Sequence, residues 1–567
     1  MSSYETSKAS MWNRLSRAGA TRALVVAAIG SVTLAACSSS STSSMSTTSS
    51  SATATTSSCH APAEWTSVKV APVAGTPTDH TLTSFDGTPI RMHWFPLSGA
   101  SKANPAPTVL MGPGWGSGGD TNSSQVGLLG EATIAQLWKA GFNVLTWDPR
   151  GFGSSGGQAE VDSVKYEAKD VSLMIDWVAA QPGVQVDAPG VPRIGMVGGS
   201  YGGGIQFVTA SIDCRVDAIA PTIAWHSLLT SLAKSDTVKS GWSNILMEAA
   251  AGKSLDPQIV AANKQQSDQG TISQASRDFF GSRGPDSLLS KVHVPTLILQ
   301  GTVDDLFTLQ EGAWNYETLH NQGNTVSMVW FCGGHGVCLT NPGNVIDAGA
   351  MSVDWMIHYV KKDTSVPVLH GFLYVDQSGT SWYSKTFPPA AGPKVNATGS
   401  GTLALNAQSL SGPSTATPSA KVPGIVDTIA LGATPAPATT ALNVPVTFSS
   451  SSLIAGAPEL TLKYTGTTPT GSRPTRVFAQ LVDTDTGLVL NNQITPIPVT
   501  LDGSTHSLTI PLEMITYSAS PNSHVELQLV ATTVAYATPR LGGSIDFTTV
   551  GLSLPTVTGV TKATTSH

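Results

Sequence analysis

The sequence predicts an α/β domain built on a largely parallel sheet, followed by an all-β domain. Between about residues 59 and 365, short apolar runs alternate with helical stretches, as in a parallel sheet covered by helices on both faces. From about residue 366, Thr, Ser, Pro and Val dominate, and turn signals separate strand-like segments. One segment, residues 524–532, alternates apolar and polar residues, which is typical of a half-buried antiparallel strand. We therefore expect a β-sandwich over residues 366–560.

The N-terminal segment is expected to lie outside both domains. Three arginines precede an apolar run at residues 24–36, which is shorter than the roughly 20 residues of a membrane-spanning helix and is typical of a secretory signal. The run ends in Leu34-Ala35-Ala36-Cys37, which resembles a bacterial lipobox and implies cleavage before Cys37 and acylation of its thiol. An ordinary signal peptide is the alternative.

Residues 1–36 are thus predicted as a lipoprotein signal peptide and residues 37–58, rich in Ser and Thr, as a flexible tether. The predicted location is the outer face of a bacterial cell membrane, with the lipid as the anchor. The chain has 567 residues and a net charge of −7, and no basic stripe occurs beyond the N-terminus. Nucleic acid is therefore not an expected partner.

Four cysteines follow Cys37, and an even number in an exported chain indicates two disulfides. Of the three possible pairings, the one with Cys332–Cys338 is favoured because this bond closes a short loop, and it leaves Cys59–Cys214. Four free buried thiols are the alternative. No cysteine spacing resembles a zinc site, so no metal is expected.

The α/β domain is predicted over residues 59–365, and it contains an interruption at residues 221–290. This interruption has helical pieces but no clear strand, and its position predicts a cap over the carboxyl ends of the strands. Helices are expected at residues 131–140 and 166–180. The expected strands of the α/β domain are residues 90–95, 108–111, 144–147, 194–197, 216–220, 296–300 and 326–330.

A nucleophile is predicted at Ser200, in the segment Gly198-Gly199-Ser200-Tyr201-Gly202, which fits the pattern G-x-S-x-G. Residues 153–157 fit the same pattern, but only Ser200 lies directly between an apolar strand and a run of small residues that can open a helix. The backbone N–H of Tyr201 is then expected to be one donor of an oxyanion hole. The N–H of Trp115, in the loop after the strand at 108–111, is the best candidate for the second.

The acid and the base of a catalytic triad are expected after Ser200, in that order. The strand at residues 296–300 leads to Asp304 and Asp305, which both qualify by position. The next strand ends before His335, which has a glycine on each side and so can lie in a loop that approaches the serine. The triad chemistry that this predicts needs no cofactor.

Several of these segments together resemble the X-prolyl dipeptidyl peptidase and cocaine esterase (CocE/NonD) family of α/β-hydrolases. The resemblance implies the α/β-hydrolase fold with a cap and a C-terminal jelly-roll domain, and it favours Asp304 over Asp305 as the acid. Members like cocaine esterase place a Tyr side chain in the oxyanion loop where this chain has Trp115, which favours a backbone donor here. The segments that carry the resemblance are residues 148–157, 170–177, 193–203, 301–304 and 333–336.

The function that follows is a serine hydrolase that cleaves an ester or amide bond of a small molecule or peptide through an acyl-enzyme. An X-Pro dipeptidyl peptidase is the main alternative, and dipeptidyl members of the family bind a free amine with carboxylates of the cap. An acyltransferase and a non-catalytic surface protein also remain open. No oligomeric state follows from the sequence. Among the carboxylates of the cap are four to which the sequence assigns no role: Asp236, Glu248, Asp256 and Asp268.

Overall fold

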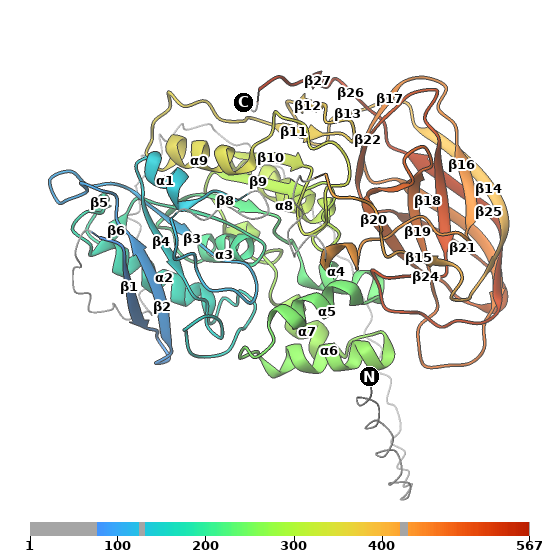
Figure 1. Ribbon diagram of the computed structural model, residues 1–567, viewed down its shortest axis with the longest axis horizontal. Helices are drawn as coiled ribbons and strands as arrows, with labels where there is room; N and C mark the ends of the chain where they lie inside the picture. The colour runs from blue at the N-terminus through green and yellow to red at the C-terminus, as the bar shows by residue number, and fades with distance from the viewer. Residues whose placement is uncertain (1–75, 124–130, 420–428, 566–567) are drawn as a thin grey trace, which may run out of the picture. The chain divides into compact units, whose positions relative to one another are not determined.

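The computed structural model describes residues 76–123, 131–419 and 429–565 (Figure 1). The largest sheet of the protein has eleven strands. In its middle, from β4 across to β11, each strand runs parallel to the next, and the strands at both edges pair antiparallel. In spatial order the strands are β1 (Thr78–Thr83), β2 (Pro89–Phe95), β4 (Asn143–Trp147), β3 (Thr108–Met111), β7 (Ile194–Gly199), β8 (Val216–Thr222), β9 (Thr296–Gly301), β10 (Val326–Phe331), β11 (Phe372–Val375), β12 (Ser381–Ser384) and β27 (Thr561–Lys562).

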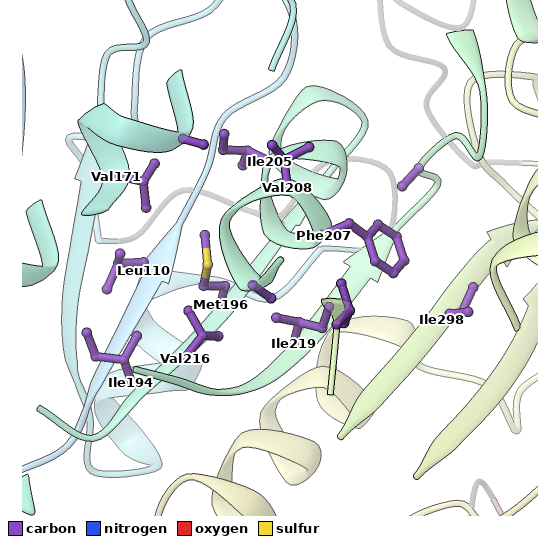
Figure 2. Packing of buried hydrophobic residues seen from close by; sticks show 14 of the residues in the cluster. Leu110, Val171, Ile194, Met196, Ile205, Phe207, Val208, Val216, Ile219 and Ile298 are labelled. Carbon is purple, nitrogen blue, oxygen red and sulfur yellow. The ribbon is translucent and has the colours of Figure 1, made fainter. Parts of the chain in front are cut away.

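Every residue of the central strands β3, β4, β7, β9 and β10 is buried, since helices cover both faces of this sheet. One cluster of buried side chains joins the sheet to α2 (Glu167–Ala179), α3 (Tyr201–Ala210) and α8 (Leu309–Asn321). Figure 2 shows part of it, with Phe207 of α3 beside Ile219 of β8. A second cluster contains α1 (Ile134–Lys139) and α9 (Ala348–Tyr359).

The segment between β8 and β9, predicted as a cap, is helical. It contains α4 (Leu228–Leu232), α5 (Ser240–Ala249), α6 (Pro257–Gln269) and α7 (Gln274–Gly281), with single 3₁₀ turns at Lys234–Asp236 and Leu289–Lys291. The ends of α6 follow from local chemistry, since the Asp256 side chain caps its first turn and Gly270 ends it in a left-handed conformation. Of the described helices, none has the length and apolar content needed to cross a bilayer.

The C-terminal region is an antiparallel sandwich of two four-stranded sheets, so the predicted fold class is confirmed. One sheet contains β14 (Val395–Ala404), β25 (Ser544–Leu554), β18 (Glu459–Thr467) and β21 (Asp502–Pro511). The other contains β16 (Leu442–Val446), β23 (Val525–Val530), β19 (Arg476–Asp483) and β20 (Leu488–Pro498).

Short strand pairs complete the described region. They are formed by β13 (Ala390–Ala391) with β26 (Val557–Thr558), β15 (Leu410–Ser411) with β24 (Thr532–Thr533), β17 (Ser452–Gly456) with β22 (Ile515–Ala519), and β5 (Val186–Ala188) with β6 (Val191–Pro192).

The predicted boundary between the domains at residues 365 and 366 needs correction. Both β11 and β12 follow it, yet both extend the α/β sheet rather than the sandwich. The physical reason is that β11, a fully buried apolar run, pairs with β10 in parallel, whereas the prediction followed the change in composition. The C-terminal strand β27 then returns from the sandwich to pair with β12.

The structure contains the predicted disulfide Cys332–Cys338, with the two Cα atoms 5.5 Å apart. Cys214 is also disulfide-bonded. Its predicted partner, Cys59, and the predicted lipidation site, Cys37, lie outside the described residues, as do the signal peptide and the tether. The pairing Cys59–Cys214 therefore stays a prediction.

Candidate active site

Ser200 lies in the sharp turn between β7 and α3, with a positive φ of 56°. Such a backbone conformation is strained for a residue with a side chain and is found at functional turns. The turn is possible because the chain has glycines around it. A Cβ atom at Gly202 would lie 2.1 Å from the carbonyl oxygen of Gly112, and one at Gly198 would lie 2.5 Å from the same oxygen.

The structure brings the three predicted triad residues together. The Nε2 atom of His335 is 2.8 Å from the Oγ atom of Ser200, and its Nδ1 atom is 2.7 Å from Oδ2 of Asp304. Asp304 is fully buried, while Ser200 and His335 are each 8 % exposed. The carboxylate of Asp304 also accepts the backbone N–H groups of His335, Leu306 and Phe307. These bonds fix its orientation toward the imidazole.

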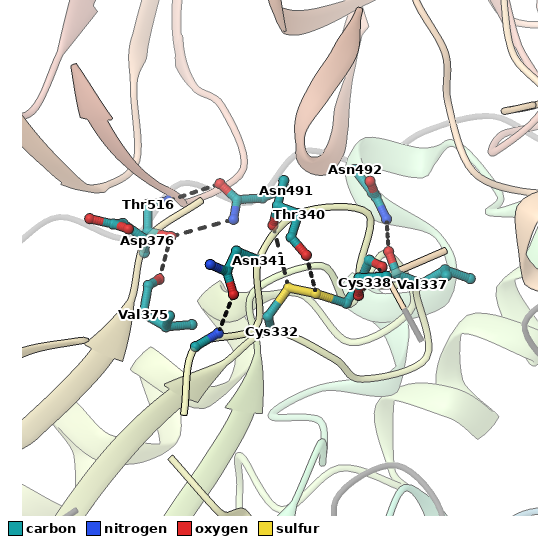
Figure 3. The surroundings of a disulfide bond; sticks show 12 residues. Cys332, Val337, Cys338, Thr340, Asn341, Val375, Asp376, Asn491, Asn492 and Thr516 are labelled. Atoms are coloured by element: carbon teal, nitrogen blue, oxygen red, sulfur yellow. Dashed lines mark hydrogen bonds between the residues drawn. A yellow bond between two sulfur atoms is a disulfide. The ribbon is translucent and has the colours of Figure 1, made fainter. Parts of the chain in front are cut away.

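The loop that carries His335 is held from several sides. Cβ atoms at Gly334 and Gly336 would lie 2.7 Å from Asp304 and 1.8 Å from the carbonyl oxygen of Val303, so both positions need glycine. The Cys332–Cys338 disulfide closes the loop around the histidine (Figure 3). The imidazole ring also packs edge-on against Trp242 and Phe307, with ring centroids 5.6 and 5.0 Å away.

Asp305, the other candidate acid, points elsewhere. Its Oδ1 atom accepts the indole N–H of Trp242 at 2.7 Å, and its Oδ2 atom has no hydrogen-bond partner in the described part of the chain. Burial, with the neighbouring charge of Asp304 adding to it, raises the pKa of Asp305 to about 7. Of the two carboxylates, Asp304 is therefore the one that meets the imidazole.

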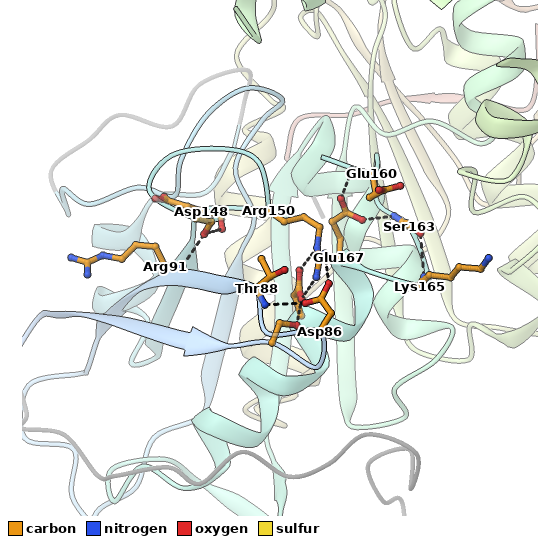
Figure 4. A network of polar contacts seen from close by, with 12 residues as sticks. Asp86, Thr88, Arg91, Asp148, Arg150, Glu160, Ser163, Lys165 and Glu167 are labelled. Carbon is orange, nitrogen blue, oxygen red and sulfur yellow. Dashed lines mark hydrogen bonds and ion pairs between the residues drawn. The ribbon is translucent and has the colours of Figure 1, made fainter. Parts of the chain in front are cut away.

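The second G-x-S-x-G segment has a structural role. The hydroxyl of Ser155 donates to the carbonyl of Asp148, and two bonds from Arg150 to Asp170, each 2.8 Å long, hold the loop on α2. A further bond joins Arg150 to Asp86 at 3.0 Å (Figure 4). Ion pairs of the buried Arg150 thus anchor this loop to α2 and to Asp86.

The two predicted oxyanion donors lie on either side of the elbow. Tyr201 is the first residue of α3, and Trp115 follows β3. Among the hydrogen bonds of the described residues, none uses the backbone N–H of either one. The indole of Trp115 is engaged, since it donates to the carbonyl of Leu246 in the cap at 2.9 Å. Only its backbone N–H is then available to an oxyanion.

The phenol of Tyr201 belongs to a buried acidic cluster that the sequence analysis missed. Its hydroxyl donates to Glu167 at 3.3 Å and accepts the backbone N–H of Asp162 at 3.4 Å. Burial raises the pKa of Glu167 to about 7, although the N–H groups of Glu160 and Ser163 oppose this (Figure 4). The pKa of Asp162 is raised by burial and by the charge of Glu167.

The sandwich supplies two further residues that the sequence analysis missed. The side-chain amide of Gln493 in β20 donates to the carbonyl of Asp304, and that of Asn492 donates to the carbonyl of Val337, both at 2.9 Å. Figure 3 shows Asn492 beside the disulfide. Asn491 and Asn492 have positive φ values of 53° and 58°, which bend β20 toward these loops.

A pocket that opens to solvent, with free space of about 850 Å³ including its mouth, reaches Ser200. The elbow contributes Ser200 and Tyr201, the loop after β3 contributes Trp115, and the cap helices α4 to α7 provide most of the remaining wall. Together, the Ser200 hydroxyl at the edge of this pocket, the imidazole, the buried carboxylate and the free N–H groups can perform nucleophilic attack on a carbonyl carbon.

Parts of the chain are similar in sequence to known proteins. A sequence model of the X-Pro dipeptidyl-peptidase (S15) family matches residues 86–336. An uncharacterised 31.7 kDa protein of Escherichia coli, from the traX-finO intergenic region, is 34 % identical over 87 residues, which are 15 % of this chain and 29 % of that protein. The chain thus spans less than a third of this curated relative.

Solved structures share the fold over nearly their whole length. A CocE/NonD family hydrolase from Staphylococcus aureus has a TM-score of 0.59 at 14 % identity and covers 88 % of this chain and 99 % of its own. An α-amino acid ester hydrolase has a TM-score of 0.58 at 12 % identity, with 86 % and 98 % covered. An aminopeptidase from a marine sediment Thaumarchaeota archaeon has a TM-score of 0.57 at 12 % identity, with 85 % and 97 % covered.

The α/β-hydrolase sheet followed by an antiparallel sandwich is the architecture of these structures. Residues 86–336 thus match the X-Pro dipeptidyl-peptidase (S15) family model, and the chain has the fold of the CocE/NonD family hydrolases.

Proposed function

We propose that the protein is a serine hydrolase that cleaves acyl ester or amide bonds through an acyl-enzyme on Ser200. The observation that carries this proposal is the continuous path of hydrogen bonds from Ser200 through His335 to Asp304, with lengths of 2.8 and 2.7 Å. A carboxylate that is fully buried and bonded to the imidazole keeps its Nε2 atom ready to accept the serine proton.

The reaction proceeds in two halves. His335 takes the proton from the hydroxyl of Ser200 while the oxygen attacks the carbonyl carbon, and the N–H groups of Tyr201 and Trp115 stabilise the oxyanion that forms. The tetrahedral intermediate collapses, and His335 gives its proton to the departing alcohol or amine. Water, activated by His335 in the same way, then releases the acid from the serine.

Replacement of the nucleophile tests the proposal. We expect Ser200→Ala to lower kcat for p-nitrophenyl esters on the order of 10⁶-fold, as the loss of the serine does in subtilisin. The variant should also no longer react with a fluorophosphonate probe. Ser155→Ala is the matched control, since it alters the second G-x-S-x-G segment, and it should keep both properties. Probe labelling of Ser200→Ala equal to that of the parent would rule out this nucleophile.

The N-terminal segment adds a location to this proposal, in which Cys37 is acylated and anchors an exported enzyme to the membrane. What supports it is the Leu34-Ala35-Ala36-Cys37 sequence after the short apolar run. In a bacterial host, the parent should fractionate with membranes and carry the mass of a diacylated cysteine. Cys37→Ala should lose that mass. A parent protein whose mature N-terminus is unmodified would contradict the anchor.

A further inference from the structure

The cavity next to Ser200 identifies a class of substrate within the proposed function, on which this inference rests. We infer that the enzyme acts on neutral esters that carry one long, flexible hydrocarbon chain, and that the cap holds this chain. The inference follows from the chemistry of the cavity wall, the position of the cap carboxylates outside that wall, and the source of the wall in four separate helices.

The wall that the cap provides is mostly apolar and carries no charged side chain. None of the twenty residues that line it in the described part of the chain is Asp, Glu, Lys, Arg or His. The side-chain amides of Asn263 and Gln266 are bonded to each other at 3.1 Å. The apolar residues of the cap wall include Leu228 and Leu232 of α4, Leu246 and Met247 of α5, Ile259 of α6 and Phe280 of α7.

A substrate with a free amine finds no counter-charge in this cavity. Asp236 pairs with Arg277, Asp256 accepts the N–H of Gln258 at the start of α6, and Asp268 pairs with Lys264. Glu248 is exposed, and no carboxylate of the cap, Asp278 and Asp286 included, lines the cavity. Because an unpaired ammonium group is costly to bury, a dipeptide with a free N-terminus is a poor occupant.

A hydrocarbon chain is the occupant that such a wall favours. Each methylene group that leaves water for an apolar wall contributes about a fourfold gain in kcat/KM, from a transfer free energy of about 0.8 kcal/mol. The free space of this pocket, about 850 Å³ with its open mouth included, leaves room for methylene groups beyond the ester itself. The gain should continue with length until the cavity is full.

Two series of substrates test this, with the full chain and with each substrate below its micelle concentration. The first contains p-nitrophenyl esters of acetic, butanoic, octanoic and dodecanoic acids. The second contains acetates of ethanol, butanol, octanol and dodecanol. We expect kcat/KM to rise by about fourfold per methylene in one of the two, which also shows whether the cavity takes the acyl or the alcohol side. Flat or falling kcat/KM in both series would overturn the inference, as would an X-Pro-p-nitroanilide that is turned over faster than every ester.

A variant of the cap tests where the hydrocarbon chain of the substrate binds. Ala262 is a buried residue of α6 that lines the cavity, whereas its neighbour Ala261 is exposed. In Figure 1, α6 lies on the side of the cap away from α3. Ala262→Phe should therefore fill the cavity and lower kcat/KM for the long esters at least tenfold more than it lowers kcat/KM for the acetate. Ala261→Phe should match the parent on every substrate.

The stability of Ala262→Phe is checked by its thermal midpoint, because overpacking can unfold a helix. If that variant does not fold, alkyl fluorophosphonates on the parent give a second measurement. Their rate of inactivation should rise with alkyl length, and equal rates for the ethyl and the dodecyl compounds would overturn the inference. Failure of the proposed function has a different signature. In that case, no ester of either series is hydrolysed in a manner that depends on Ser200.

Discussion

Two adjacent carboxylates, Asp304 and Asp305, differ only in their partners. The oxygens of Asp304 accept the Nδ1 proton of His335 and three backbone N–H groups, so its negative charge is stabilised although the residue is buried. Asp305 has a single indole donor, and its pKa is raised to about 7 mainly by burial. The environment rather than the position in the sequence therefore separates the carboxylate that orients the imidazole from a neighbour whose pKa is raised.

This difference predicts unequal effects of the same substitution. Asp304→Asn should lower kcat by about 10⁴-fold, because an amide cannot hold the imidazole in the tautomer that accepts the serine proton. Asp305→Asn preserves the acceptor for the indole of Trp242 and should stay within about tenfold of the parent. Steady-state kinetics on one p-nitrophenyl ester measures both. A larger loss in Asp305→Asn than in Asp304→Asn would mean that the acid is wrongly assigned.

A methyl group at the elbow should be poorly tolerated. Gly202→Ala places a Cβ atom 2.1 Å from the backbone oxygen of Gly112, which no side-chain rotation can relieve. We expect the free energy of unfolding to fall by about 1–3 kcal/mol or more, since this range is the usual cost of overpacking. Gly281→Ala in α7 is the control, since nothing lies within 4 Å of its added methyl. Denaturant unfolding measures both, and equal midpoints would show that the approach of the two segments is looser than the structure has it.

At the scale of the element, β20 links the sandwich to the triad. Its pairing with β19 slips in register between Gln480 and Val482, and the residues freed on β20 reach the loops of the α/β domain. Gln493 supports the acid loop and Asn492 supports the base loop. The sandwich therefore takes part in positioning the site, in addition to any effect on stability.

Removal of one of these supports should affect turnover more than binding. Gln493→Leu leaves the carbonyl of Asp304 without its donor, and we expect kcat to fall by roughly tenfold with KM little changed, since a lost buried hydrogen bond costs about 1–3 kcal/mol. Gln480→Leu is the matched control. It removes another buried glutamine of the same sheet, whose bonds to Ser411 and Gln528 stay within the sandwich. If both variants lose the same fraction of kcat, the effect of Gln493 is only structural.

Local patterns predicted the elements that depend on neighbours in the sequence. The strands β2, β3, β4, β7, β8, β9 and β10, the strand–turn–helix at Ser200 and the loop of His335 could all be expected, because apolar runs and glycines report on local geometry. The bond between Gln493 and Asp304 joins residues 189 positions apart, and no local pattern indicates it. The same limit applies to β11, whose parallel partner rather than its composition assigns it to the α/β sheet.

At the scale of the whole described region, buried charges join the cap, the acid loop and the sandwich. Lys234 of the cap pairs with Glu513 of the sandwich at 2.6 Å, and Thr308 donates to the same carboxylate at 2.9 Å. Lys239, which is fully buried before α5, donates to the carbonyl of Leu306 at 2.8 Å. Pairs of this kind contribute little net stability, but the loss of one partner is costly, so they oppose changes in the way the parts pack.

These buried acids predict a dependence of stability on pH with two opposite slopes. Burial raises the pKa of Asp305 from 3.8 to about 7, so the folded state holds a proton that the unfolded state has lost. Its contribution is therefore fully present below about pH 4 and falls as the pH rises to about 7. Burial opposes the charge of Glu513, but Lys234 and Lys239 outweigh it and lower the pKa of that residue below 4.5, so its contribution is lost as the pH falls through the acidic range.

Denaturant unfolding of the parent, Asp305→Asn and Glu513→Gln between pH 3 and pH 8 separates the contributions of Asp305 and Glu513 to the free energy of unfolding. The parent should lose stability relative to Asp305→Asn from about pH 4 to about pH 7, by on the order of a few kcal/mol, with no further change above. Relative to Glu513→Gln, the parent should instead gain stability as the pH rises through the range below 4.5. Because the two residues titrate in separate ranges, parallel curves for the parent and Asp305→Asn would show that the buried carboxyl of Asp305 ionises at its ordinary pKa in the folded protein.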